Sequence, residues 1–291
     1  MSGPPMRLPW ILAILALPLS PQDAHVVGGA IETRVQTLTQ AKDWNGLADF
    51  FETLSPKERG LRLTGWLQAL NRSQRWERLA QVCDAVLPQE DAQQGAKLTL
   101  TRLLRAQALS QLQRHPEAMV AHAENGRLGW AEGYPNACAE ARLCRDWPSL
   151  QAHAEALLAK TPDHPQALAW KGEALARMDQ FSQAEPLLQK ALTLDPKQPE
   201  GWSNLGRCLN ERKAWAEGLA ACDQALALAP TLMEAHYNRG RACFELARYQ
   251  EARDAFQTAL TMLPGDPVLQ ENLRQAQRYL DSVNKPKKNK K

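Results

Sequence analysis

Apolar residues return every three or four positions through the second half of the chain, and the whole pattern repeats after 34 residues. Prolines and glycines mark this interval, at Pro162, Pro196, Pro230 and Pro264 and at Gly172, Gly206 and Gly240. A spacing of three or four predicts amphipathic α-helices, and each proline ends a helix because its ring cannot continue one. A fixed period of this length predicts stacked units, each of which buries its apolar face against a neighbour.

The predicted unit is a pair of helices joined by a turn. Small residues such as Gly206 and Ala252 lie where the two helices must approach closely, and bulky residues such as Phe181, Trp215 and Tyr249 can wedge between one pair and the next. An all-α fold follows from this pattern. Regular units are expected over residues 165–198, 199–232 and 233–264, after a degenerate unit over residues 131–164.

Residues at fixed places in each unit carry a family resemblance. The best unit reads Trp202-x-x-Leu205-Gly206-x-x-Leu209, and the next contains Ala252-x-x-x-Phe256. With the closing proline, these units resemble tetratricopeptide (TPR) repeats, whose signature spans 34 residues. The resemblance implies an α-solenoid that winds as a superhelix. It assigns a repeat-defining structural role to Gly172, Ala184, Pro196, Trp202, Leu205, Gly206, Pro230, Gly240, Ala252, Phe256 and Pro264.

Outside the regular units the pattern weakens on both sides. Residues 26–130 are predicted to form degenerate TPR-like helical repeats, because Asp43-Trp44-x-x-Leu47 and Arg75-Trp76-x-x-Leu79 copy the start of a second helix. Residues 265–283 are expected to form a capping helix with a polar outer face, which a solenoid needs at its end. Residues 284–291 are predicted to be a disordered basic tail.

The N-terminus contains a short apolar segment. Arg7 precedes an uncharged run from Leu8 to Leu19, which has the length of a signal-peptide core and is too short to span a bilayer. Residues 1–25 therefore predict a signal peptide or an anchor, and with it an exported or membrane-associated protein. The alternatives are an apolar helix packed on the first repeat and a cytoplasmic location.

Charge and composition limit the classes of partner. The net charge is +3, and the five lysines of the tail account for more than the whole of it. The body is therefore not a basic nucleic-acid surface, and no nucleic acid partner is expected. The tail can contact an anionic surface or remain a solvated terminus.

Signals of catalysis are missing from the sequence. No phosphate-binding loop, nucleophile elbow or dinucleotide motif is present. The six cysteines occupy interior helix positions, where a thiol acts as a small hydrophobe, and the six histidines are scattered. We expect no enzyme activity, no cofactor and no metal site.

The TPR resemblance implies a concave surface lined by the first helix of each pair. Its exposed positions form one column at Asn136, Trp170, Asn204 and Asn238, and the next at Ala139, Glu173, Arg207 and Arg241. Amides can hold an extended peptide backbone and guanidiniums can take a carboxylate. The surface is similar to the carboxylate clamp of chaperone-binding TPR proteins, although the clamp lysines are not reproduced and Glu173 adds a negative charge.

Seven residues are thus candidates for partner binding, with a plain solvated helix face as the alternative. Trp170 is either an anchor for a partner or a displaced core residue. The candidates are Asn136, Trp170, Glu173, Asn204, Arg207, Asn238 and Arg241.

Two functions follow. The first is a scaffold that binds a protein or peptide segment, such as an acidic or C-terminal carboxylate segment, in its concave groove. The second is an exported or membrane-associated assembly factor, similar to the TPR subunits of cytochrome c biogenesis and outer-membrane assembly.

Overall fold

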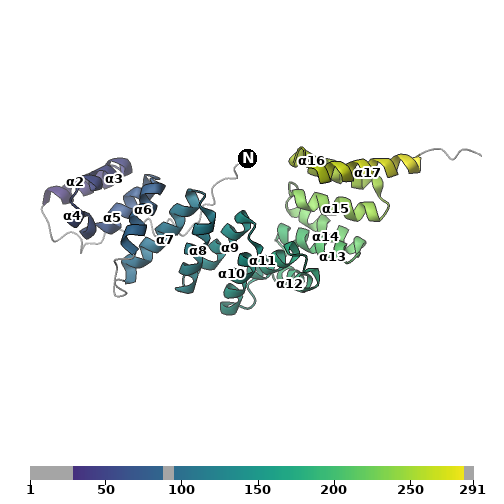
Figure 1. Cartoon of the computed structure of the whole chain (residues 1–291), viewed down its shortest axis with the longest axis horizontal. Helices are drawn as coiled ribbons and strands as arrows, with labels where there is room; N and C mark the ends of the chain where they lie inside the picture. The colour runs from purple at the N-terminus through teal and green to yellow at the C-terminus, as the bar shows by residue number, and fades with distance from the viewer. Residues whose placement is uncertain (1–28, 88–94, 285–291) are drawn as a thin grey trace, which may run out of the picture. The chain divides into compact units, whose positions relative to one another are not determined.

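The computed structural model describes residues 29–87 and 95–284, which form α-helices joined by short turns and contain no strand (Figure 1). The predicted all-α fold of consecutively packed helices is confirmed. The described residues divide into two compact units, one that ends at Gly133 and one that begins at Tyr134. Residues 1–28, which hold the predicted signal or anchor, and residues 285–291 of the predicted basic tail lie outside the described residues.

The helices of the first unit are α2 (Gly29–Gln40), α3 (Trp44–Thr53), α4 (Pro56–Leu61), α5 (Leu63–Arg72), α6 (Trp76–Val86), α7 (Gly95–Gln111) and α8 (His115–Arg127). Its core is a continuous apolar cluster that includes Leu47, Phe51, Leu67 and Leu79. Asp43 caps α3 by accepting a hydrogen bond from the Gly46 backbone N–H at 2.8 Å.

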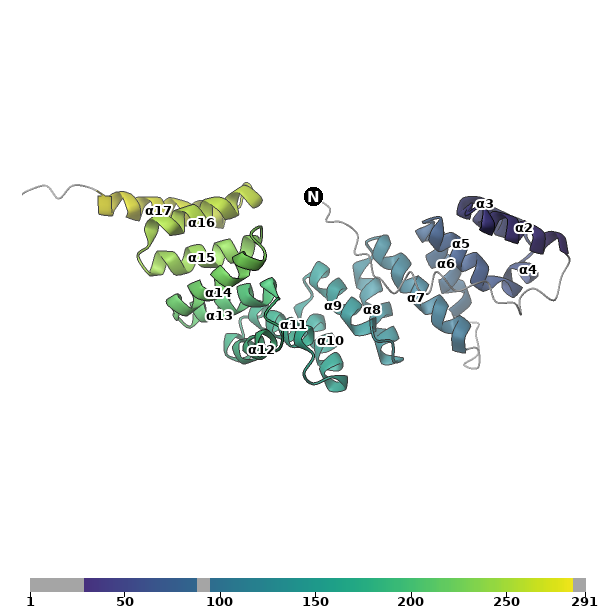
Figure 2. The same ribbon diagram turned by 180° about the vertical axis from the view of Figure 1, so that it is seen from behind.

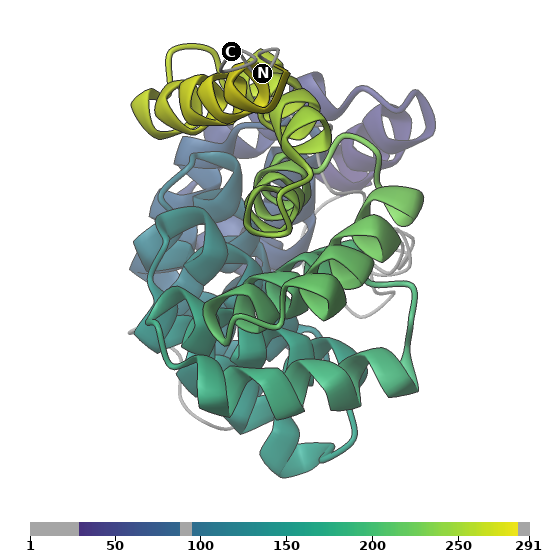
Figure 3. The ribbon, with the colours of Figure 1, turned by 90° about the vertical axis from the view of Figure 1, so that its right-hand side faces the viewer.

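Helix α9 (Gly133–Cys144) begins at the boundary between the units. The second unit continues with α10 (Trp147–Lys160), α11 (Pro165–Arg177), α12 (Phe181–Leu194), α13 (Pro199–Glu211), α14 (Trp215–Leu228), α15 (Met233–Glu245), α16 (Tyr249–Met262) and α17 (Pro267–Asn284). The pairs α11/α12, α13/α14 and α15/α16 stack in chain order, and α17 packs on α16 (Figures 2 and 3).

Sequence features fix where these helices begin and end. Pro165 and Pro199 are the first residues of α11 and α13, where a proline costs no hydrogen bond. The closing prolines Pro196, Pro230 and Pro264 each lie two residues beyond the last residue of a second helix. No helix in the described ranges is both long and apolar enough to cross a membrane.

The glycines of the repeats allow close contact within each pair. A Cβ on Gly206 would lie 2.6 Å from Cys222 Sγ, and one on Gly240 would lie 2.6 Å from the ring of Phe256. The buried neighbours Leu205, Ala252 and Phe256 fill the space around these contacts. Helix α17 covers the last pair with Leu269 and Ala276, which are buried in the same apolar cluster as Phe256.

The turns inside the helix pairs use an unusual backbone conformation at a regular interval. Asp179, Lys213 and Ala247 have φ values of 60°, 63° and 58°, and they follow one another at 34 residues. This left-handed region disfavours residues with a Cβ by roughly 1–2 kcal/mol. None of the three turns uses glycine, so each holds its residue at a cost to stability.

Ala247→Gly should therefore raise the free energy of unfolding, by about 0.5–1 kcal/mol, since glycine accepts the left-handed turn without strain. The matched control is Ala220→Gly, because Ala220 is also exposed but lies in the interior of α14. That change should lower stability by about 1 kcal/mol. Urea unfolding of the two variants followed by circular dichroism tests the opposite signs, and a loss of stability in both would contradict the expectation.

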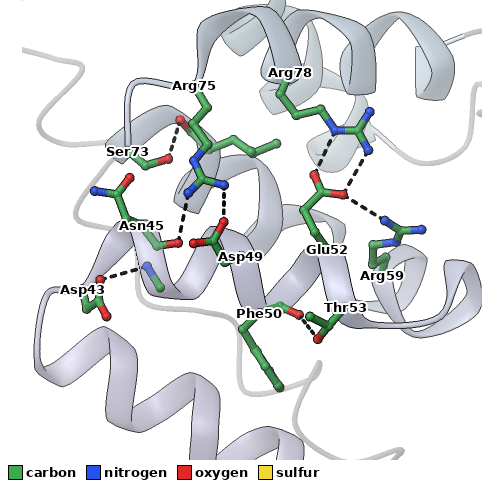
Figure 4. Close-up of polar contacts among 12 residues, drawn as sticks. Asp43, Asn45, Asp49, Phe50, Glu52, Thr53, Arg59, Ser73, Arg75 and Arg78 are labelled. Atoms are coloured by element: carbon green, nitrogen blue, oxygen red, sulfur yellow. Dashed lines mark hydrogen bonds and ion pairs between the residues drawn. The ribbon is translucent and has the colours of Figure 1, made fainter.

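Ion pairs connect three helices of the first unit. Figure 4 shows Glu52 of α3 between two guanidiniums, with its Oε2 3.1 Å from Arg59 Nη1 of α4 and its Oε1 2.9 Å from Arg78 Nε of α6. Asp49 of α3 lies 2.6 Å from Arg75, which precedes α6. The hydrogen bond from Arg78 lowers the pKa of Glu52 below its ordinary value of 4.5, against the opposing effect of burial.

Glu52→Gln should destabilise the first unit at neutral pH and have little effect in acid. A carboxyl group whose pKa is lowered by folding adds stability above its unfolded-state pKa, and this stability disappears as the pH falls through the folded-state pKa. Because Glu52 is partly exposed, the expected loss is only about 0.5–1 kcal/mol. Thermal unfolding at neutral pH and below the ordinary pKa, with Glu77→Gln at an exposed position of α6 as control, measures the difference. If the difference in stability between the wild type and Glu52→Gln stayed constant with pH, the ionised pair could not be the cause of that difference.

Candidate functional site

Two neighbouring cavities lie along the first helices α11, α13 and α15. The first, here called the Trp170 cavity, has a volume of about 220 Å³. The second, the Arg207 cavity, has a volume of about 180 Å³. Asn204 lines both, so the cavities meet at this residue.

Six of the seven candidate residues line these cavities. Trp170, Glu173 and Asn204 line the Trp170 cavity, and Asn204, Arg207, Asn238 and Arg241 line the Arg207 cavity. Asn136, half-buried in α9, lines neither of the two. The structure thus brings together the candidates from α11, α13 and α15 and leaves the one from the degenerate repeat apart.

Trp170 takes part in both the core and the surface. Its side chain packs against the apolar cluster of Tyr134, Leu157 and Ala167, and it also forms one wall of the Trp170 cavity. The two interpretations of this tryptophan are therefore compatible, because one face supports the stack of helices while another remains available to a ligand.

Glu173 is the most buried charged residue of the site. It is 5% exposed, and its Oε2 lies 2.9 Å from Arg142 Nε of α9. Burial raises the pKa of Glu173, whereas the charges of Arg142 and Arg177 act in the opposite direction. The nearby negative charge of Glu200 adds to the upward shift of the Glu173 pKa. The carboxyl group is thus held in place by one guanidinium and repelled by a second carboxylate.

The two candidate arginines already have acidic partners in the preceding repeat. Arg207 Nη2 lies 3.0 Å from Asp179 Oδ1, and Arg241 Nη1 lies 2.8 Å from Glu211 Oε1. Each guanidinium also lies near an aromatic ring, at 5.3 Å from the centroid of Phe181 and 6.0 Å from that of Tyr237. These contacts position the guanidiniums, and a ligand carboxylate has to compete with the acidic residues.

The lining of the Arg207 cavity itself includes more cations than anions. Its charged lining consists of Arg177, Arg207, Arg241, Glu211 and Glu234. Arg177 and Glu234 lie 3.8 Å apart, which is near the limit of an ion pair. Together with Asp179, which pairs with Arg207, three carboxylates balance the three guanidiniums, so an anionic group of a ligand can bind these guanidiniums beside or in place of a carboxylate.

The two asparagines of the site differ in what their amides do. Asn238 is 4% exposed and its side-chain Nδ2 donates to the main-chain carbonyl of Ser203 at 3.3 Å, while the main-chain carbonyl of Asn238 accepts from Asn210 Nδ2 at 2.9 Å. Asn238 therefore links α15 to α13 through hydrogen bonds. The Asn204 side chain makes no hydrogen bond to another residue in ranges 29–87 and 95–284, so its amide remains available to a ligand.

Several lining residues were not among the candidates. Glu200 and Glu234 occupy equivalent places 34 residues apart, near the start of α13 and α15, and Gln166 precedes them at the same interval in α11. This third column lies one helical turn N-terminal to the first column and repeats at the same interval of 34 residues, so the sequence contains a signal for it. The burial of Gln198, which precedes α13, has no such sequence signal.

The cysteines are free, and five of the six are buried. Burial raises the pKa of the Cys83, Cys138, Cys208 and Cys222 thiols to about 12. Cys144 departs from the expected interior position, since it is only half-buried near the end of α9. The buried thiols behave as small apolar side chains and take no part in the two cavities.

Comparison with known protein families identifies the segment that contains the regular repeats. Tetratricopeptide repeat family models match residues 151–208 and residues 198–264. The sequence matches no curated protein.

Several solved structures are similar to this chain. YrrB, described as a TPR protein with an unusual peptide-binding site, is 19% identical over 67% of this chain and 99% of that chain, with a TM-score of 0.47. The MamA RS-1 ArsTM double mutant is 17% identical over 58% of this chain and 97% of that chain, with a TM-score of 0.49. The first TPR of Spaghetti (RPAP3), bound to an HSP90 peptide, is 24% identical over 40% of this chain and 93% of that chain, with a TM-score of 0.38.

The family matches fall on the three regular helix pairs and on most of α10, the second helix of the degenerate unit before them. They agree with the 34-residue period, the paired helices and the close glycine contacts described above. Residues 151–264 of this chain are therefore tetratricopeptide repeats.

Proposed function

We propose that this protein is a scaffold that holds an extended segment of a partner protein across the Trp170 and Arg207 cavities. Tetratricopeptide repeats are protein-interaction modules, so a protein or peptide partner follows from the family. The observation that supports this surface is the contact between the two cavities at Asn204. A peptide segment that crosses both cavities can form a hydrogen bond with the Asn204 amide and place one side chain in each cavity.

The size of the cavities favours side chains of a polypeptide over a small-molecule ligand. Pockets for drug-sized ligands have volumes of roughly 300–1,000 Å³. The two cavities are smaller, at about 220 and 180 Å³, and polar groups line both. Each has room for one or two side chains, and their order along α11, α13 and α15 suits a chain in extended conformation.

The Arg207 cavity is proposed to take an acidic side chain or a C-terminal carboxylate. Arg207 and Arg241 are held by Asp179 and Glu211, so the incoming carboxylate joins or replaces these acidic partners. Charge-assisted hydrogen bonds to guanidinium are among the stronger polar contacts of proteins. The proposed role is binding, without a chemical step.

A photo-crosslinking amino acid tests the location of the partner. It is placed at Glu234, which lines the Arg207 cavity, and in a second variant at Lys190, an exposed residue of α12 that lines neither cavity. We expect a crosslinked partner from position 234 in cells and not from position 190. Excess unlabelled partner should suppress the crosslink. Equal labelling at both positions would contradict binding in the cavities.

A role as an exported or membrane-associated assembly factor is a second proposal, and it rests on the apolar run from Leu8 to Leu19. Fractionation of the full chain with a C-terminal tag, compared with a chain whose Leu12 and Leu15 are changed to Asp, tests it. The wild type is expected in the exported or membrane fraction and the variant in the soluble cell fraction. Identical distributions would remove this proposal.

A further inference from the structure

The Trp170 cavity is lined by a residue whose buried hydrogen-bond acceptor has no partner among residues 29–87 and 95–284. Gln198 lines the cavity and is only 5% exposed. Its Nε2 donates to the carbonyls of Asp195 at 3.1 Å and Ala191 at 3.5 Å, which fixes the orientation of the amide. Its Oε1 is buried and accepts no hydrogen bond from the part of the chain that the structure describes. A buried acceptor left in this state costs free energy until a donor reaches it.

The charge of the same cavity is negative. Glu173 and Glu200 line it with one cation, Arg142, which is paired with Glu173 at 2.9 Å. Glu200 is exposed and makes no ion pair with a residue of the described ranges. The repulsion between the two carboxylates is relieved when a second positive charge lies beside them.

An aromatic wall completes the cavity. The Trp170 side chain is half-buried and lines the cavity together with Ala169 and Gly201. Such a wall suits the methylene stem of a long basic side chain, and an indole ring also attracts a cation over its face. The free acceptor, the negative charge and the apolar wall all suit a long basic side chain.

We infer that the Trp170 cavity is a subsite for a lysine or arginine side chain of the bound partner segment. The stem of that side chain packs on Trp170, and its N–H groups donate to Glu200 and to the Oε1 of Gln198. This inference rests on the proposed scaffold function and adds the chemistry of one position of the partner. Because the guanidiniums of the Arg207 cavity next to it are proposed to bind a carboxylate, the partner segment carries a basic residue and an acidic residue in fixed order. Opposite charges in adjacent cavities also reject a segment in the reverse register.

Selection of random dodecapeptides on the immobilised full chain tests the inference. We expect lysine or arginine to be enriched at one position of the selected peptides. Synthetic peptides then give a double-mutant cycle, in which Glu200→Gln in the protein is combined with alanine at the basic position of the peptide. Each single change should raise Kd roughly tenfold, as for the loss of a charge-assisted hydrogen bond, and the combined change should add little to either.

Two further variants test whether the charge at position 200 determines the affinity for the basic peptides. Glu217→Gln is the matched control, because Glu217 is exposed, pairs with Arg212 and lines neither cavity, and it should leave Kd unchanged. Glu200→Lys should lose the basic peptides and bind a peptide in which the basic residue is replaced by glutamate.

The outcomes distinguish this inference from the function on which it rests. Selected peptides without an enriched basic residue, or a cycle in which the two changes are additive, overturn the basic subsite and leave the scaffold in place. Failure to select any peptide from the library overturns both.

Discussion

Replacing Phe256 with alanine should lower the free energy of unfolding by about 3–5 kcal/mol, the range for loss of a buried aromatic side chain. Phe256 is 2% exposed and belongs to the cluster that joins α15, α16 and α17. Its ring also contacts the position of Gly240, where any Cβ would collide with it. Removal therefore opens a cavity at the point where the last pair and the helix that covers it meet.

Chemical denaturation of the full chain measures this change, and Tyr279→Ala serves as the control. Tyr279 is an aromatic residue of α17 that is half exposed and stacks on Tyr249 at 5.2 Å. Because less of its surface is buried, its loss should cost clearly less than that of Phe256. Equal costs for the two variants would mean that the α16 core is less closely packed than the structure shows.

The double variant Arg207→Ala/Arg241→Ala should weaken binding of a partner captured at the cavities by roughly 30-fold or more, the effect of losing an interface hot spot of about 2 kcal/mol. Both guanidiniums line the Arg207 cavity and are positioned by Asp179 and Glu211. Affinity for the wild type should fall as salt rises, because the partner charges are partly screened at this accessible site. Isothermal titration calorimetry at two salt concentrations measures both effects.

Arg212→Ala/Arg248→Ala provides a control with the same change of charge. Arg212 pairs with Glu185 and Glu217, Arg248 pairs with Glu251, and neither lines a cavity of the site. Both double variants should keep nearly the wild-type melting temperature, since partly exposed ion pairs add little to folding. If the control weakened binding as much as the cavity variant, the general charge of the surface would explain the effect.

The sequence predicted the fold well because each period of 34 residues corresponds to one packed pair of helices. The spacing of Gly206 and Gly240 marks the closest approach of the paired helices, and the spacing of Pro196 and Pro230 marks their ends. The columns of first-helix residues also led to six residues of the cavity lining, since a regular stack places equivalent residues on one face.

Contacts between repeats could not be predicted in the same way. Arg207 pairs with Asp179 in a turn, and Arg241 pairs with Glu211 at the end of a helix, so equivalent arginines use partners from different places. Equivalent amides also diverge, because Asn238 bonds to the backbone of α13 whereas Asn204 does not form such a bond to α11. These differences depend on side-chain conformations, which the period does not encode.

The position of Asn204 at the junction of the cavities has a thermodynamic consequence. A side-chain amide has an acceptor on one side and donors on the other. When a cationic group in the Trp170 cavity engages Oδ1, Nδ2 is left for an anion in the Arg207 cavity. Occupation of either subsite then prepares the amide for the other, and linkage requires the gain in affinity to be the same in both directions. A segment that bears both charges should accordingly bind with a free energy more favourable than the sum of the binding free energies of its two halves.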